Sequence, residues 1–329
     1  MKKVKHLDIY LITLALIALT AVSLRTVACL TAFNPATLHF ADKTAIGISN
    51  LLVTLGVVFS ATFFFTRQKN LYLVASAENA ATYIPAGLVS VALLFIGLER
   101  YYAMDSMVFD SILLKYLSYA LIGLAGISIP AFFLLIFNSK NESNARAALF
   151  LCIVLYLTVY SLYLYFNRSV HPLNSPNKIV DQMAYLFAAM FFLFETRISL
   201  GRAIWKPYII FGLCASLLTA YSAIPSLIVY LVNGSVISDS TNETAVTLAL
   251  CIFITSRVIL TGRLSEDVEC PEAEAISTLS DVRKAEMADK KKSLRAHVIN
   301  NNEENDTVDT ENYQFDIPEV APRAEETEE

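Results

Sequence analysis

The sequence has little glycine, few histidines and none of the common catalytic motifs. Glycine supplies 10 of 329 residues, about 3 % against an average near 7 %, although membrane helices that break or slide usually need small residues. The zinc-protease motif H-E-x-x-H, the nucleophile motif G-x-S-x-G and the phosphate-binding Walker A motif are absent. We therefore predict no enzymatic activity and no cofactor. The histidines are too scattered for a metal site within one element: His6, His39, His171 and His297.

Cysteine is also sparse, and its spacing excludes a disulfide framework or a metal site. The five cysteines stand singly, four of them inside apolar segments: Cys29, Cys152, Cys214, Cys251 and Cys270. A free cysteine in such a segment behaves as a small buried hydrophobic residue. We assign these thiols no chemical role.

Apolar residues, in contrast, are abundant. They make up 55 % of the chain, and the mean hydropathy is +0.52, which is too apolar for an ordinary globular protein. Runs of about 17 to 25 apolar residues can cross a hydrocarbon core, and the sequence contains eight: Ile9–Phe33, Ala45–Phe65, Ala80–Tyr102, Leu113–Phe137, Ala145–Phe166, Ile179–Ile198, Tyr208–Val232 and Thr244–Leu260. The first run is too long for a cleaved signal peptide. The predicted fold class is an all-α, polytopic transmembrane helical bundle of about eight spans, formed by residues 1–263.

Charge divides the chain into two regions. Residues 1–263 hold 18 Lys/Arg and 11 Asp/Glu, whereas residues 264–329 hold 7 and 19. Lys and Arg are concentrated on one side of the predicted spans, which places both termini in the cytoplasm. Residues 264–329 are predicted to form a cytoplasmic tail with a short charged helix, followed by an acidic, mostly disordered segment. A bacterial inner membrane is the preferred location, and a eukaryotic plasma membrane is the alternative.

Four of the charged residues within the predicted spans are candidates for an intramembrane charge network: Arg25, Asp181, Glu195 and Arg257. Charges at membrane depth usually face protein or water. The predicted orientation places Arg25 and Asp181 in the outer leaflet, and Glu195 and Arg257 in the inner leaflet. We therefore predict a charge network in which span six joins spans one and eight. Two alternatives are that Glu195 and Arg257 snorkel to the cytoplasmic surface, and that Lys178 satisfies Asp181 locally.

Hydroxyl groups also gather in spans five and seven. Tyr156, Tyr160 and Tyr163 fall on one helical face, and Tyr221 and Ser222 lie close to Pro225. Phenolic hydroxyls in lipid need partners, so these residues are predicted to face the bundle interior. They are candidates to line a cavity between spans five, six and seven. The alternative is a packed interface without a cavity.

These patterns favour two classes of function. The first is a membrane sensor, scaffold or assembly protein that uses the tail to bind a cytoplasmic protein, with the segment 313–318, YQFDIP, as a docking candidate. The alternative is a permease for a small solute that uses the charges of span six. The lipid bilayer is the other predicted partner, and no nucleic-acid partner is predicted.

Overall fold

The structure is a computed structural model, and it describes most of the membrane region of the chain. The described residues are 6–34, 39–65, 80–104, 111–137, 144–167, 176–200, 205–234, 240–266 and 289. The chain divides into two units, Met1–Ser280 and Asp281–Glu329. Except for residues 264–266 and 289, the predicted tail lies outside the described residues, and so does the segment 313–318.

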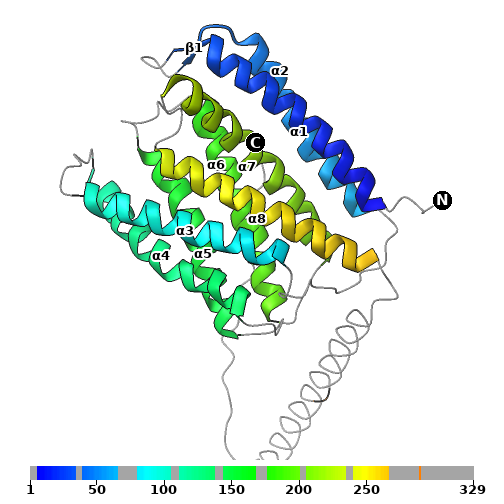
Figure 1. Cartoon of the computed structure of the whole chain (residues 1–329), viewed down its shortest axis with the longest axis vertical. Coiled ribbons are helices and arrows are strands. Elements are labelled where there is room, and N and C mark those ends of the chain that lie inside the picture. The colour runs from blue at the N-terminus through cyan, green and yellow to red at the C-terminus, as the bar shows by residue number, and fades with distance from the viewer. Residues whose placement is uncertain are drawn as a thin grey trace, which may run out of the picture. The chain divides into compact units, whose positions relative to one another are not determined.

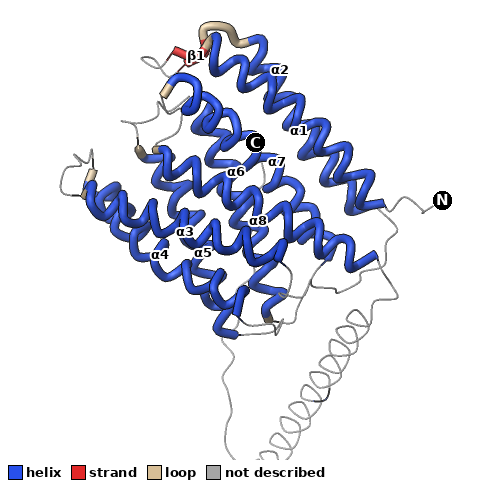
Figure 2. The backbone as a smooth tube through the Cα atoms, viewed as in Figure 1, coloured by secondary structure: helices blue, strands red, loops and turns tan. Residues whose placement is uncertain are grey.

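Eight helices in the described residues are long and apolar enough to cross a membrane, which confirms the predicted fold class. Figure 2 shows that helix accounts for almost all of the described backbone. The helices are α1 (His6–Thr31), α2 (Thr44–Ala61), α3 (Ala80–Ala103), α4 (Ile112–Phe137), α5 (Asn144–Phe166), α6 (Pro176–Ser199), α7 (Trp205–Asn233) and α8 (Thr241–Glu266). A short 3-10 helix, η1 (Thr62–Phe65), extends α2.

A short pair of β-strands connects α1 and α2. The helix stops at Thr31, and the strand β1 (Phe33–Asn34) pairs antiparallel with β2 (His39–Phe40). Asp42 then accepts a hydrogen bond from the Thr44 backbone N–H at 2.8 Å. This bond to the first residue of α2 holds the pKa of Asp42 below its usual value. We call this end of the bundle the hairpin end, and the end where α1 begins and α8 finishes the terminal end.

Helices α3 to α8 form a closed ring. Each packs against the next in chain order, and α8 returns to pack against α3. The α1–α2 pair lies outside the ring against α7, and Figure 1 shows these two helices running side by side along one edge of the bundle. Short connections make successive helices antiparallel. A side chain that links two non-adjacent helices of the ring must therefore cross its interior.

Large apolar side chains cover the outside of the bundle, whereas phenylalanines fill the middle of the ring. On α1, for example, Leu16 and Leu19 are 60 % and 66 % exposed, as expected for a surface that faces lipid. Inside the ring, ring-centroid distances of 5.3 to 6.2 Å connect four fully buried residues from α4, α5, α6 and α8: Phe132, Phe150, Phe192 and Phe253. We call this group the phenylalanine layer. It fills the interior of the ring with edge-to-face, tilted and stacked contacts.

Candidate functional site

The most strongly connected polar group inside the ring is an ion pair between α6 and α8. Arg257 donates from Nε to Glu195 Oε1 at 2.9 Å and from Nη2 to Oε2 at 3.2 Å. The two side chains are only 2 % and 1 % exposed. A bidentate pair fixes orientation as well as charge. Because α6 and α8 are not neighbours in the ring, the pair spans its interior.

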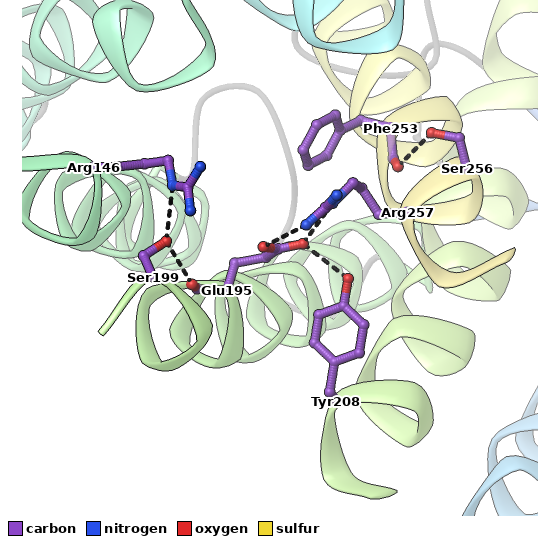
Figure 3. A network of polar contacts seen from close by, with 7 residues as sticks. All are labelled: Arg146, Glu195, Ser199, Tyr208, Phe253, Ser256 and Arg257. Carbon is purple, nitrogen blue, oxygen red and sulfur yellow. Dashed lines mark hydrogen bonds and ion pairs between the residues drawn. The ribbon is translucent and has the colours of Figure 1, made fainter. Parts of the chain in front are cut away.

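Side chains of α5 and α7 extend this ion pair into a cluster (Figure 3). The Tyr208 hydroxyl of α7 donates to Glu195 Oε1 at 2.8 Å. Ser199 Oγ donates to the Glu195 backbone carbonyl at 3.0 Å and accepts from Arg146 Nε of α5 at 3.1 Å. We call Arg146, Glu195, Ser199, Tyr208 and Arg257 the carboxylate cluster. It connects four consecutive helices near the terminal end.

A second charged group lies towards the hairpin end, between α1, α6 and α7. The Arg25 guanidinium stands over the Tyr221 ring at 4.4 Å, and its Nη2 donates to Asn177 Oδ1 at 3.0 Å. Asp181, one turn after Asn177 on α6, accepts from Ser222 Oγ at 2.5 Å. Arg25 is 2 % exposed and Asp181 is 5 % exposed. We call these five residues the arginine cluster.

Arg25 and Asp181 interact electrostatically but do not form a direct ion pair in the described part of the chain. Each charge instead bonds to a neutral side chain. The Arg25 Nε and Nη1 atoms are buried and have no hydrogen-bond partner there. A buried donor left unsatisfied costs about 1–3 kcal/mol, and more when it is charged. The arginine cluster is therefore polar but incompletely paired.

The tyrosines of α5 form a third polar group, on the hairpin side of the phenylalanine layer. Tyr156, Tyr160 and Tyr163 stack along α5 with centroid distances of 6.1 and 6.0 Å. Arg100 of α3 lies over the Tyr160 and Tyr163 rings at 4.9 and 4.6 Å. From α6, Tyr185 contacts Tyr160 edge-on, and its hydroxyl lies 2.6 Å from Thr247 Oγ1 of α8. These six residues form the tyrosine layer.

The tyrosine layer, the phenylalanine layer and the carboxylate cluster follow the same order along the helices of the ring. On α6, Tyr185 is followed by Phe192 and then Glu195, and on α8 Thr247 is followed by Phe253 and then Arg257. At a rise of 1.5 Å per residue, Tyr185 and Glu195 are about 15 Å apart along the helix. The interior therefore carries a polar layer on each side of an apolar one.

The structure separates the residues proposed to line one cavity. Tyr156, Tyr160 and Tyr163 belong to the tyrosine layer, whereas Tyr221 and Ser222 belong to the arginine cluster. Tyr221 also donates to Asn50 Oδ1 of α2 at 2.7 Å, outside the ring. These five side chains therefore belong to two separate polar groups. The three α5 rings are at most 4 % exposed and are stacked on one another.

The hydrogen bonds described for Lys178 are with the end of α5 and not with Asp181. Its Nζ donates to the backbone carbonyls of Tyr165 and Asn167 at 3.0 and 3.3 Å. These carbonyls belong to the C-terminal end of α5, where a positive charge complements the helix dipole. The lysine thus fastens the start of α6 to the end of α5.

Several cluster residues were not singled out from the sequence. Arg100 and Arg146 lie near span ends, where they resemble membrane-surface anchors, yet they are only 7 % and 3 % exposed. Tyr185 and Tyr208 are two of 16 tyrosines, and no local motif distinguishes them. A search for charges at equal depth on different spans could have found Arg146, since it begins span five where Glu195 ends span six.

Within the described residues, no three His, Cys, Asp or Glu side chains gather so as to hold a metal ion. Cys29, Cys152, Cys214 and Cys251 are free thiols, and Cys270 lies outside the described residues. The side chains of the carboxylate cluster, the arginine cluster and the tyrosine layer can bind charged groups and donate hydrogen bonds. No protein-family model, curated protein or solved structure matches this chain.

Proposed function

We propose that this protein is a membrane sensor or scaffold in which the helix bundle holds α8 and presents the following charged segment to a cytoplasmic protein. The carboxylate cluster is the observation that supports this proposal. Nine residues before α8 ends at Glu266, Arg257 bonds to Glu195 of α6, and the same carboxylate accepts a hydrogen bond from Tyr208 of α7. A shift of α6 or α7 therefore acts directly on the helix that leads into the tail.

The composition of the tail defines the kind of partner. Residues 264–329 hold 19 Asp/Glu against 7 Lys/Arg, so a basic protein surface would be attracted to it electrostatically. The segment 313–318, YQFDIP, adds aromatic and apolar side chains that can anchor a short peptide in a groove. The proposed partner is therefore a cytoplasmic protein with a basic surface and an apolar pocket.

Chemical cross-linking in living cells, before the membrane is dissolved, tests this proposal. N-terminally tagged chains would be compared as full length, as a chain ending at Glu266, and as the variants Y313A/F315A and N301A/N302A. A cross-linked cytoplasmic protein should be lost from the shortened chain and from Y313A/F315A, but kept by the matched asparagine control. Identical cross-links in all four chains would contradict the proposal.

The order of layers inside the ring supports a second candidate, a permease for a small polar solute. The tyrosine layer and the carboxylate cluster are polar, and the phenylalanine layer between them would act as the gate. Purified protein in liposomes would be tested for uptake of labelled amino acids, sugars and small carboxylates. Uptake that E195Q abolishes and E99Q leaves intact would favour the permease, and no uptake across this panel would favour the sensor or scaffold.

A further inference from the structure

The arginine cluster combines a buried cation and a buried anion that do not pair directly. Arg25 lies six residues before the end of α1, about 9 Å along the helix, and its side chain is 2 % exposed. Its Nη2 donates to the neutral Asn177 amide, and the Tyr221 ring covers one face of the guanidinium. Neither contact neutralises the positive charge. Because Asp181 lies within electrostatic reach, a direct pair would be the simpler arrangement.

The Arg25 donors that lack an acceptor indicate which kind of ligand would complete the cluster. A guanidinium carries five N–H donors, one on Nε and two on each Nη. The atoms Nε and Nη1, which carry three of these donors, are buried without an acceptor in the described part of the chain. For Asp181 the bond observed is the one that Oδ1 accepts from Ser222. The site therefore offers unused donors on a cation, close to a carboxylate that accepts from a neutral hydroxyl.

Apolar side chains cover the cluster at the hairpin end. Cys29, one turn after Arg25 on α1, lies beside the guanidinium and packs in a buried group with Phe40 of β2 and Val229 of α7. This cover separates Arg25 from the hairpin end of the bundle. In such a low-dielectric place, both hydrogen bonds and charge contacts to a ligand are strengthened.

We propose that the arginine cluster binds a small zwitterion, with an oxyanion on Arg25 and an ammonium group on Asp181. An α-amino acid has these two groups, and so does the head group of phosphatidylethanolamine. The oxyanion accepts from the free Arg25 donors, and the ammonium donates to the Asp181 carboxylate. This arrangement neutralises both charges with one molecule, which neither a simple anion nor a simple amine can do. The site lies outside the ring's carboxylate cluster, so the inference is independent of the proposed function.

Thermal unfolding of the purified full-length protein in nanodiscs tests the site, with two arms that separate the two sources. In one arm the discs contain only phosphatidylglycerol and the standard amino acids are added singly. In the other arm phosphatidylethanolamine replaces part of the lipid and no amino acid is added. A rise in the unfolding temperature in either arm is expected, and the arm identifies the source. Acetate or methylammonium alone should give little change.

The variants R25K, R25M and D181N should each bind the ligand about tenfold more weakly or worse, since one charge contact or the planar guanidinium is lost. About tenfold more ligand should then be needed for the same rise in the unfolding temperature. D181N keeps the shape of the side chain, which limits its effect on folding. T20A is the matched control, because the Thr20 hydroxyl of the same helix is exposed and donates only to backbone carbonyls of α1. The proposal fails if neither arm stabilises the wild type, if acetate alone gives the full response, or if D181N and R25K respond like T20A.

Discussion

Glu195 is the residue on which the terminal end of the bundle depends most. Its carboxylate receives two bonds from Arg257 and one from Tyr208, and it is 1 % exposed. Removing one partner of a buried ion pair leaves the other charge uncompensated in a low-dielectric interior. The net value of the pair is smaller, because both charges lost their hydration when the bundle formed. Single and double substitutions at this pair should therefore differ sharply.

We predict that E195Q lowers the free energy of unfolding by about 3–5 kcal/mol. The double variant E195Q/R257M should lose less than the sum of E195Q and R257M, because no charge is then left unpaired. Denaturant unfolding in detergent micelles, followed by circular dichroism, measures all three variants. E99Q is the control, since the part-buried Glu99 accepts from the neutral donors Ser240 and Asn242. Additive losses at the two positions would contradict the prediction.

Tyr208 should contribute less than the arginine. Y208F removes the 2.8 Å hydrogen bond to Glu195 Oε1 but keeps the ring contact with Phe191, whose centroid lies 5.0 Å away. A hydrogen bond to a charged group contributes about 1.5–3 kcal/mol, so Y208F is expected to be milder than E195Q. The same unfolding measurement tests this ranking. A loss equal to that of E195Q would mean that the hydroxyl, and not the arginine, holds the carboxylate.

Hydropathy and depth reveal some of these contacts but not others. Glu195 and Arg257 could be matched from the sequence because both are charges at the same end of apolar spans. Arg25 and Asp181 were matched by the same reasoning, yet the structure gives each a neutral partner, Asn177 and Ser222. Depth places two charges at one level of the membrane. It does not determine which side chains of neighbouring helices reach them first.

Among the helices, α7 and α8 approach each other closely at a single glycine. A Cβ atom on Gly212 would overlap the Val258 side chain of α8 and come within 3.2 Å of Phe191. Valine is stiff because it is branched at Cβ, so it cannot easily move aside. Gly123 of α4 has nothing within 4 Å of the same position. Helix packing at Gly212 therefore requires a small residue.

We predict that G212A lowers the free energy of unfolding by about 1–3 kcal/mol, the usual cost of overpacking. G123A should be neutral or stabilising by up to about 1 kcal/mol, since alanine favours a helix more than glycine does. The two substitutions add the same atom, which makes them a matched pair for thermal unfolding. Equal effects of G212A and G123A would show that α7 and α8 are not in close contact at this position.

The number of helices could be predicted from the sequence, but which helices pack against each other could not. A run of about 17 to 25 apolar residues predicted each span, and the structure has a helix at all eight of them. The β1–β2 pair was missed because Phe33 and Phe40 are as apolar as the span before them. The closure of α8 against α3 was also not predictable. Lipid-facing and interior faces are both apolar, so hydropathy does not identify which faces meet.

For the whole molecule, an even number of spans decides where the ends of the described bundle lie. Eight crossings put His6 and Glu266 on the same side of the membrane, and the distribution of Lys and Arg predicts that this side is the cytoplasm. The hairpin end, with β1 and β2, then faces the opposite side. This orientation would place the tail beside cytoplasmic partners.

Reporter fusions in a bacterial host test this orientation. A fluorescent protein fused before Met1 or after Glu329 should fluoresce, because it folds in the cytoplasm, whereas alkaline phosphatase at these positions should be inactive. Phosphatase joined after Gly234, where α7 has ended at the hairpin end, should be active. An active phosphatase at the C-terminus together with a fluorescent N-terminus would require an odd number of spans. The tail would then lie outside the cell, and a cytoplasmic partner would be impossible.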